Sequence, residues 1–320
     1  MRVLVWHVHS TWLDAFVQGG HEYLLPTLPE GGPWGAGRAG RSLPASVHEV
    51  PVPRLADTDI DVVVLQRPEE LRLTADWLRR EPGRELPAIY VEHDVPGAEV
   101  PNSRHPVADR RDLTLVHVTH FNETMWDAGT TMTTVIEPGV LDPGDRYTGE
   151  LARAAVVVDD PIRRWRMTGT DLLPRFAEGA ELDVFGTGLG ELNRELRIGE
   201  HRLHAVADLP AGQLHEAMAR RRVYLHPMRW TSLGLSLIEA MHLGMPVVAL
   251  ASTEVVRAVP PEAGVVSTRI DDLTDTLREL MQDRPMARQL GKQAREHALS
   301  RYGLDAFLLR WDDLLRHTAR

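Results

Sequence analysis

Apolar runs a few residues long alternate with amphipathic stretches along the first part of the chain. Short β-rich runs that are apolar on both faces are typical of buried parallel strands. The predicted strands are residues 1–8, 61–65, 88–91, 113–118 and 133–136, and the stretches 71–80 and 122–128 have helical spacing. Strands that alternate with helices indicate βαβ units and a mostly parallel sheet.

The same alternation starts again after a polar, glycine-containing stretch at residues 144–152. This second part has predicted strands at 154–158, 182–185, 223–226 and 246–250, predicted helices at 169–176, 214–220 and 235–242, and an almost continuous helical pattern over 271–317. We therefore predict an α/β fold with two Rossmann-like domains, residues 1–148 and 149–302, followed by a helix in residues 303–320. Ligands bind beyond the carboxyl ends of such strands, so parallel sheets that face each other would leave an interdomain cleft for a site.

One segment, residues 29–44, follows neither period and is rich in glycine, proline and arginine. Such a composition predicts a loop. Two interpretations stay open, a surface excursion and a mobile loop near a ligand.

Composition narrows the function classes. A chain of 320 residues is long enough for two domains, and the absence of cysteine excludes a disulfide framework, a thiolate metal site and a cysteine nucleophile. A formal net charge of −10 argues against broad nucleic-acid binding, which requires a positive surface. Residues 1–10 lack the features of a signal peptide, and no apolar run approaches the ~20 residues of a transmembrane segment. We expect a cytoplasmic protein with no transmembrane segment, and the composition leaves room for a peripheral membrane contact.

The segment 223–250 (VYLHPMRWTSLGLSLIEAMHLGMPVVAL) contains the most informative pattern. A strand ends at a proline, and Ser232 is the expected N-cap of the helix that follows. Gly234 permits a close backbone approach, and the free N–H groups and dipole of a helix start favour a diphosphate. Glu239, in the same helix, is suited to accept both hydroxyls of a ribose.

The run GLSLIEAMHLGMPVVA resembles the signature of the large family of retaining glycosyltransferases that includes sucrose synthases and bacterial phosphatidylinositol mannosyltransferases. The resemblance implies the GT-B fold, with the donor bound mainly by the second domain. It implies that Glu239 holds the nucleotide ribose and that the backbone of Leu233, Gly234 and Leu235 holds the sugar and phosphate. The family's first Glu, which contacts sugar hydroxyls, is replaced by Thr231, so the sugar stays open.

Two further stretches of the second half are similar to elements of that family. In Arg163–Gly169 (RRWRMTG), Arg163 matches the arginine that binds the donor diphosphate, and the family's lysine falls at Thr168, so Arg166 is expected to supply the second charge. The alternative is a solvated basic turn. Gly186 and Gly188 follow a predicted strand as the family's Gly-x-Gly does, and they either line the nucleotide pocket or form only a tight turn.

The first half is matched only by layout and a few turns. Gly19 and Gly20, predicted to precede a helix, resemble the family's Gly-Gly turn near the donor phosphates. His93 follows a predicted strand at the place where the family has a histidine beside the reacting sugar, and Asp94 is expected to orient it. The alternative is a strand-end histidine bonded to backbone.

His117 and His120 are candidate acceptor-side residues that end the next predicted strand. Their alternative role is to cap the helix that begins near Asn122. The group around Glu92 and His93 could also bind a metal, but a lone pair of such residues is poor evidence for a metal site. The family that the chain resembles often works without a tightly held metal, so we expect none.

The resemblance implies a hexosyltransferase that takes a nucleoside-diphosphate sugar as co-substrate, needs no other cofactor, and transfers the sugar to an unidentified acceptor with retention of configuration. It also implies that the final helix packs back on the first domain. No carboxylate is obviously placed as a covalent nucleophile, which favours departure and attack on the same face. Two alternatives remain, a nucleotide-sugar epimerase on the same fold and a non-catalytic sugar-nucleotide binding protein.

Overall fold

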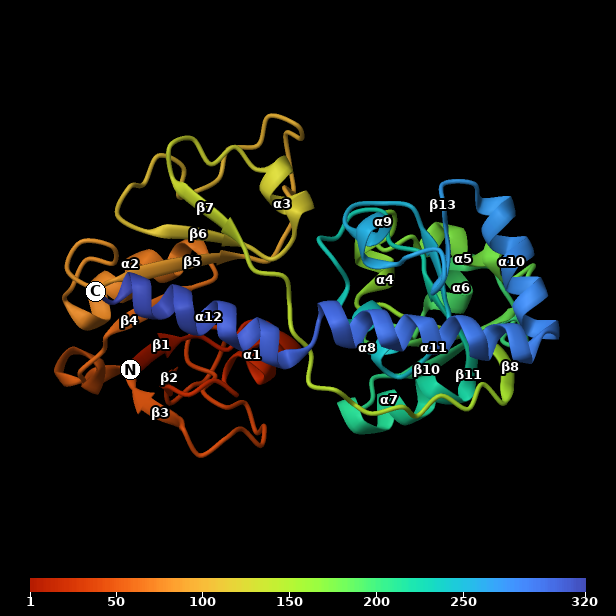
Figure 1. Ribbon diagram of the computed structural model, residues 1–320, viewed down its shortest axis with the longest axis horizontal. Coiled ribbons are helices and arrows are strands. Elements are labelled where there is room, and N and C mark those ends of the chain that lie inside the picture. Colours follow the sequence, from red (N-terminus) through yellow and green to blue (C-terminus); the bar gives the residue numbers. More distant parts are fainter. The chain divides into compact units, whose positions relative to one another are not determined.

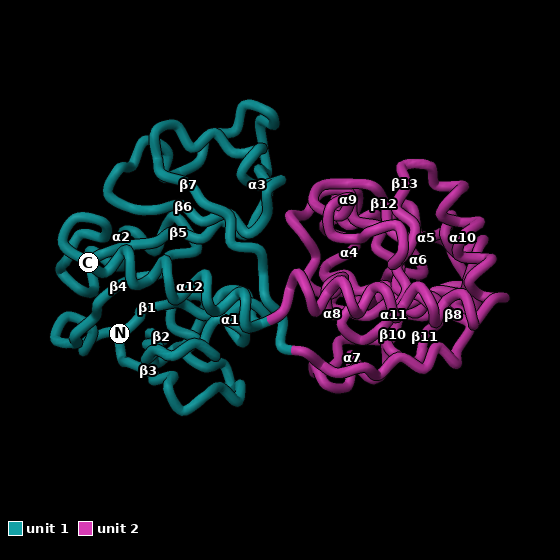
Figure 2. The backbone as a smooth tube through the Cα atoms, in the orientation of Figure 1, with its two compact units in different colours: residues 1–141, 304–320 teal, residues 142–303 magenta.

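The computed structural model describes residues 1–320 and divides into two compact units (Figure 2). Unit 1 comprises residues 1–141 together with 304–320, and unit 2 comprises residues 142–303. The chain thus leaves unit 1 after Leu141 and returns to it at Leu304, so the final helix is part of the first unit.

Unit 1 is built on a seven-stranded, entirely parallel sheet in the order β3-β2-β1-β4-β5-β6-β7. Its strands are β1 (Arg2–Val5), β2 (Glu22–Thr27), β3 (Val47–Pro51), β4 (Val62–Leu65), β5 (Ala88–Glu92), β6 (Thr114–His117) and β7 (Met132–Val135). Its helices are α1 (Ser10–Phe16), the 3-10 helix η1 (Val52–Asp57), α2 (Pro68–Leu78), α3 (His120–Met125) and α12 (Leu304–Thr318). The order of the strands reverses between β1 and β4, which is where ligands bind in open α/β sheets.

Two strands of unit 1, β2 and β3, were not predicted. β2 follows a pair of glycines and was expected to be helical, but it is apolar and buried along most of its length and pairs with β1. β3 is an edge strand whose side chains are mostly exposed, so its sequence has no apolar run that would predict a strand.

Aromatic side chains join α12 to α1 in unit 1, and the two helices lie side by side (Figure 1). The ring of Trp311 meets Phe16 edge-on with centroids 5.0 Å apart and meets Trp12 at 5.7 Å. All three side chains are almost fully buried. Large buried aromatic surfaces of this kind dominate core energetics, so α12 completes the core of unit 1.

Unit 2 has a six-stranded parallel sheet in the order β10-β9-β8-β11-β12-β13. Its strands are β8 (Leu151–Val157), β9 (Glu181–Phe185), β10 (Leu203–Ala207), β11 (Arg221–His226), β12 (Val247–Leu250) and β13 (Gly264–Ser267). Its helices are α4 (Pro161–Arg164), η2 (Thr170–Leu172), α5 (Leu173–Phe176), α6 (Leu192–Leu196), α7 (Ala211–Arg220), α8 (Leu235–His242), α9 (Val255–Ala258), α10 (Ile270–Gln282) and α11 (Arg284–Arg301). The order reverses between β8 and β11, so the loops that follow these two strands flank the expected binding position.

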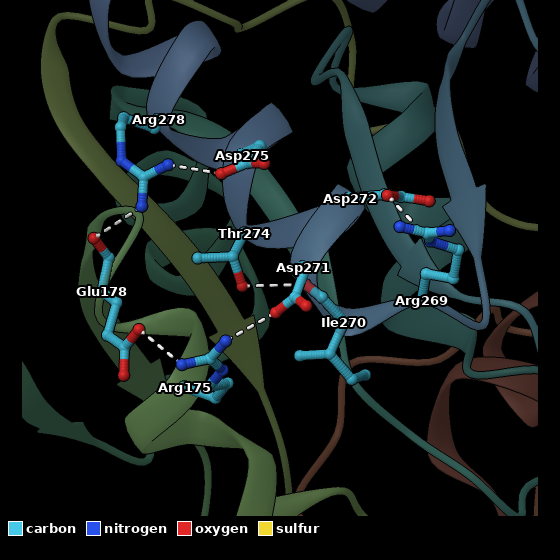
Figure 3. Close-up of polar contacts among 9 residues, drawn as sticks. All are labelled: Arg175, Glu178, Arg269, Ile270, Asp271, Asp272, Thr274, Asp275 and Arg278. Carbon is cyan, nitrogen blue, oxygen red and sulfur yellow. Dashed lines mark hydrogen bonds and ion pairs between the residues drawn. The ribbon is translucent and has the colours of Figure 1, made fainter.

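Helices at the end of unit 2 pack closely on its earlier elements. A Cβ added to Gly291 of α11 would lie 2.0 Å from the carbonyl oxygen of Gly244, just after α8, so the glycine permits this approach. On the surface, Arg175 of α5 donates to Asp271 of α10 at 2.6 Å, and Arg278 donates to the carbonyl oxygen of Glu178 (Figure 3). None of the helices is long and apolar enough to cross a bilayer.

Candidate functional site

The start of α8 has no side-chain cap in unit 2. Gly234 occupies the N-cap position, and no side chain makes a capping hydrogen bond at this helix start. The expectation that Ser232 caps the helix is therefore wrong. A Cβ at Gly234 would lie 2.7 Å from Cε1 of His226, because the imidazole packs against this turn. The uncapped first turn leaves backbone N–H groups and the positive end of the helix dipole available to an anion.

The other residues of the signature lie in the loop before α8 or in α8 itself. Thr231 is half-buried in the loop before α8, Leu233 is buried, and Leu235 is the first helical residue. Glu239 follows in the same helix with 8% of its surface exposed, and a carboxylate oxygen lies 3.5 Å from Nε2 of His215 on α7.

The segment between β8 and η2, residues 158–169, contains α4 and is called the β8–α4 turn; it carries the two predicted phosphate-binding arginines. Arg163 is the third residue of α4, and its exposed guanidinium pairs with Asp160 at 2.8 Å. Arg166 is equally exposed and lies 3.2 Å from Asp171. Gly169, with φ of 72°, is required here because a Cβ would lie 2.0 Å from the carbonyl oxygen of Pro227. Each arginine therefore has a carboxylate partner as well as access to solvent.

Thr168, at the family's lysine position, is buried rather than exposed. Its hydroxyl donates to the carbonyl oxygen of Trp165 and shares a hydrogen bond of 2.8 Å with Thr170. No positive charge is available at this position.

Arg229 supplies a nearby charge that the sequence analysis did not single out. Its guanidinium forms two hydrogen bonds with Asp171 and a third, of 3.0 Å, with the carbonyl oxygen of Arg166. Its backbone N–H donates to Met167 at 2.9 Å. Arg229 thus ties the loop after β11 to the turn that carries Arg166. Its place just before the signature (HPMRWTSLG) was the available signal.

Gly186 and Gly188 form a tight turn after β9 and also border a hollow. Their φ angles are 128° and 70°, and a Cβ on Gly186 would lie 2.0 Å from the carbonyl oxygen of Val158. The hollow has a volume of about 660 Å³, and its wall consists of residues 186–190 with Asn193, Glu200, His204, Ala205, Ala207 and Asp208. The two glycines therefore form a tight turn and also line a hollow.

In unit 1, two histidines meet at the carboxyl edge of the sheet. His9 follows β1 and His93 follows β5, and their ring centroids lie 4.2 Å apart. Trp12 meets His93 edge-on at 5.0 Å. Burial holds the pKa of His93 well below its usual range, and the neighbouring His9 adds to this effect. The pKa of His9 is lowered by burial, against the attraction of Asp94. Both imidazoles are therefore uncharged at neutral pH.

Gln66, which follows β4, orients His93. Its carboxamide oxygen lies 3.0 Å from Nε2 of His93. Asp94 is exposed, its backbone N–H donates to Glu92, and it makes no hydrogen bond to His93. The expectation that Asp94 orients the histidine is therefore wrong, as is the alternative of a bond from His93 to the backbone. Gln66 was missed because it is distant in sequence from His93.

The two acceptor-side candidates differ sharply in exposure. His117 is fully buried, neither of its ring nitrogens has a hydrogen-bond partner, and burial together with His105 lowers its pKa to about 4. It cannot touch an acceptor in this structure. His120 is exposed as the first residue of α3. Thr119 caps that helix by accepting from the N–H of Asn122 at 3.0 Å, so neither histidine is the cap.

Gly19 and Gly20 lie away from these groups. They stand between α1 and β2, so they are at the amino end of the parallel sheet, whereas His9, Gln66 and His93 follow strands. The prediction that the pair precedes a helix is wrong. The placement removes the geometric basis for a contact with donor phosphates.

The glycine-rich segment 29–44 is anchored at the carboxyl edge of unit 1. The carbonyl oxygen of Gly37 lies 3.2 Å from Nδ1 of His7, which follows β1. Arg67, the residue after Gln66, places its guanidinium carbon over the ring of Trp34, 4.0 Å from the ring centroid. The segment therefore runs next to the histidine pair.

A comparison with protein families gives a match within the second unit. The family model described as "Glycosyl transferases group 1" matches residues 172–297. A search of curated proteins by sequence gives no match.

Solved structures share the fold of the whole chain. Sucrose-phosphate synthase from Thermosynechococcus elongatus has a TM-score of 0.76 at 15% identity, over 99% of this chain and 98% of that chain. Anabaena HepE, in complex with UDP, has a TM-score of 0.74 at 14% identity, over 99% of this chain and 100% of that chain. WaaG, a glycosyltransferase involved in lipopolysaccharide biosynthesis, has a TM-score of 0.70 at 14% identity, over 98% and 99%. The shared architecture of two parallel-sheet α/β domains is the GT-B fold, as the sequence predicted.

Proposed function

We propose that this protein is a glycosyltransferase that moves a hexose from a nucleoside-diphosphate sugar to an acceptor with retention of configuration. The match of residues 172–297 to the glycosyl transferases group 1 model and the GT-B fold of the whole chain support this proposal. The donor binds unit 2 and serves as co-substrate, and no other cofactor or metal takes part. The acceptor binds unit 1.

The uncapped start of α8 carries this proposal. A diphosphate needs several N–H donors and a positive field, and the first turn of α8 offers both. Glu239, in the same helix, is the carboxylate that accepts the hydroxyls of the ribose.

The arginines of the β8–α4 turn stabilise the departing diphosphate. Charge develops on the leaving phosphate oxygens in the transition state, and preorganised cations there lower the barrier. Arg163 and Arg166 are exposed on this turn, and the ion pairs that each makes within the chain are replaced in part by phosphate oxygens on binding. Arg229 holds the turn in place.

Uridine is the first base to test. The HepE structures similar to this chain hold UDP, UDP with glucose, or UDP-glucose. UDP-glucose is therefore the first donor probe.

A thermal titration with UDP, GDP, ADP and TDP tests the donor site. A ligand at a hundred times its Kd stabilises the folded state by about 2.7 kcal/mol. One of the four diphosphates should raise the Tm of the wild type, and Glu239→Ala should lose that response. Glu216→Ala, an exposed glutamate on neighbouring α7, is the matched control and should keep it. If no diphosphate raises the Tm, or if Glu239→Ala responds as the wild type does, the proposed donor site is wrong.

A non-catalytic sugar-nucleotide binding protein is the second candidate, because the buried Thr168 lacks the charge that lysine has in the family. A diphosphate response without hydrolysis or transfer, across a wide acceptor set, would favour it. Where product forms, the anomeric coupling constant of the new linkage in a proton NMR spectrum reports whether the configuration is retained.

A further inference from the structure

The carboxamide of Gln66 can lie only one way round. Its Nε2 lies 2.8 Å from the carbonyl oxygen of Trp6, which only accepts hydrogen bonds. The amide nitrogen must therefore face Trp6, and the oxygen Oε1 must face His93. The Gln66 backbone is fixed as well, because its N–H donates to the fully buried Glu70 at 2.6 Å.

This orientation decides which nitrogen of His93 carries the proton. Oε1 of Gln66 accepts only, so Nε2 of His93, 3.0 Å away, must donate to it. The ring is neutral, so the second nitrogen, Nδ1, carries a lone pair and no proton. Nδ1 has no hydrogen-bond partner within the chain, and His93 is half-buried rather than sealed.

We propose that Gln66 is a positioning residue that holds His93 in the Nε2–H tautomer, so that Nδ1 accepts a hydrogen bond from a hydroxyl group of the bound sugar. This inference rests on the proposed function, in which the protein transfers a hexose. Gln66 itself touches no substrate and acts through the imidazole.

The tautomer sets what the sugar must offer at this position. A neutral imidazole that presents a lone pair attracts a hydroxyl hydrogen. A site in which a polar group is built to pair with a hydroxyl discriminates strongly against analogues that lack it. We therefore expect one hydroxyl of the hexose, the one that meets Nδ1, to be required for efficient transfer.

The charged neighbours do not reverse this assignment. His9 faces the ring of His93, and both Asp94 and Arg67 act on His9 with opposite signs. Trp12, on α1, contributes only an aromatic edge. No cation or carboxylate in the chain pairs directly with His93.

Nitrogen NMR of the histidine side chains tests the tautomer directly. Long-range proton–nitrogen correlation separates protonated from unprotonated ring nitrogens, and a His93→Gln spectrum identifies the signal that belongs to His93. Wild-type protein at pH 7.5 should show a protonated Nε2 and an unprotonated Nδ1. A protonated Nδ1, or an even mixture of tautomers, overturns the proposal whether or not a sugar nucleotide binds.

Two substitutions separate positioning from mere packing. Gln66→Met removes the acceptor and should convert His93 to a mixture of tautomers. Gln66→Glu places a carboxylate beside Nε2 and should raise the pH at which His93 gains its second proton. The matched control Gln18→Glu adds the same charge on an exposed residue at the other edge of the sheet and should change neither signal. If Gln66→Met is folded and keeps the wild-type tautomer, Gln66 does not position the ring.

Donor turnover tests the consequence for specificity. Gln66→Met should lower kcat/KM for UDP-glucose by roughly tenfold, and one of the 2-, 3-, 4- and 6-deoxy analogues of UDP-glucose should lose a similar factor with the wild type. If all four deoxy analogues are used as well as UDP-glucose, the inference is wrong. If no UDP sugar binds or turns over while the NMR shows the Nε2–H tautomer, the choice of UDP donor fails and the positioning role of Gln66 stands.

Discussion

Unit 2 presents glycines, an uncapped helix start and exposed arginines after β8, β9 and β11, whereas unit 1 presents uncharged imidazoles after β1 and β5. Both sets stand at the carboxyl ends of parallel strands. In the site proposed for unit 2, much of the recognition would come from backbone groups, which require glycine at fixed places. In the site proposed for unit 1, it would come from side chains that distant segments bring together.

The difference follows from the chemistry each unit would serve. A diphosphate carries charge that backbone N–H groups and guanidinium groups can stabilise. A sugar hydroxyl is neutral and needs a donor or an acceptor at one defined atom. Burial keeps His9 and His93 neutral and so turns them into such groups.

The largest expected effect comes from Gly234→Ala in unit 2. The new methyl group would press on the buried His226, and overpacking of this kind costs roughly 1–3 kcal/mol. The variant should also lose most of its Tm response to the diphosphate that stabilises the wild type. Gly20→Ala in unit 1 is the control, because nothing lies within 4 Å of its added Cβ. Equal effects of the two substitutions, measured by urea unfolding and thermal titration, would remove the contrast between the units.

The second effect is acid destabilisation through one buried histidine in each unit. Burial lowers the pKa of His226 in unit 2 to about 4, and burial together with His105 does the same for His117 in unit 1. The unfolded chain takes up these protons near pH 6.5 and the folded chain does not, so stability is present above pH 6.5 and is lost as the pH falls toward 4. Each histidine should account for about 2 kcal/mol of the loss between pH 7 and pH 5.

Urea unfolding at the two pH values measures this loss. His117→Leu and His226→Leu should each reduce the difference in unfolding free energy between pH 7 and pH 5. If a variant loses as much unfolding free energy between pH 7 and pH 5 as the wild type does, that histidine is not neutral in the folded chain. A reduction for only one of them would show that the two units differ in acid sensitivity.

The third effect concerns the clamp of unit 2, in which Arg229 ties the loop after β11 to the turn that carries Arg166. Arg229→Ala removes the hydrogen bonds to Asp171 and Arg166, so the turn that carries the arginines proposed to bind phosphate should loosen. The affinity for the stabilising diphosphate should fall by roughly tenfold, the effect of one or two lost charge-assisted hydrogen bonds. Calorimetric titration gives the Kd, and Arg269→Ala, an exposed paired arginine on the same unit, is the control. An unchanged Kd in Arg229→Ala would show that the clamp is dispensable.

The smallest effect is expected at an exposed arginine of α10. Arg278→Ala removes the ion pair with Asp275 in the same helix and the hydrogen bond to the carbonyl oxygen of Glu178 (Figure 3). Solvent screens such pairs, so the Tm should stay within about 2 °C of the wild type and the diphosphate response should be unchanged. A larger shift in a thermal melt would mean that surface pairs, and not the apolar core, hold the helices of unit 2.

The amino-acid sequence by itself determined the α/β class, the central strands of both units, and α8 over Leu235–His242. The strands could be predicted because buried strands are apolar on both faces. The helix α8 could be predicted because a glycine directly precedes its apolar pattern. The edge strands β3, β10 and β13 escaped, since half-exposed strands have mixed patterns. β2 was mistaken for a helix because a short apolar run fits either period.

Only the tertiary structure decided the side-chain site of unit 1 and the clamp of unit 2. Gln66 and His93 are 27 positions apart and meet because β4 and β5 are neighbouring parallel strands that end at the same edge. Gly19 and Gly20 lie at the opposite edge because β2, rather than a helix, follows them. His117 ends a strand whose neighbouring residues 115–119 are all buried, whereas His120 begins α3 and is exposed. Strand order and facing depend on pairings between distant segments, which local pattern cannot specify.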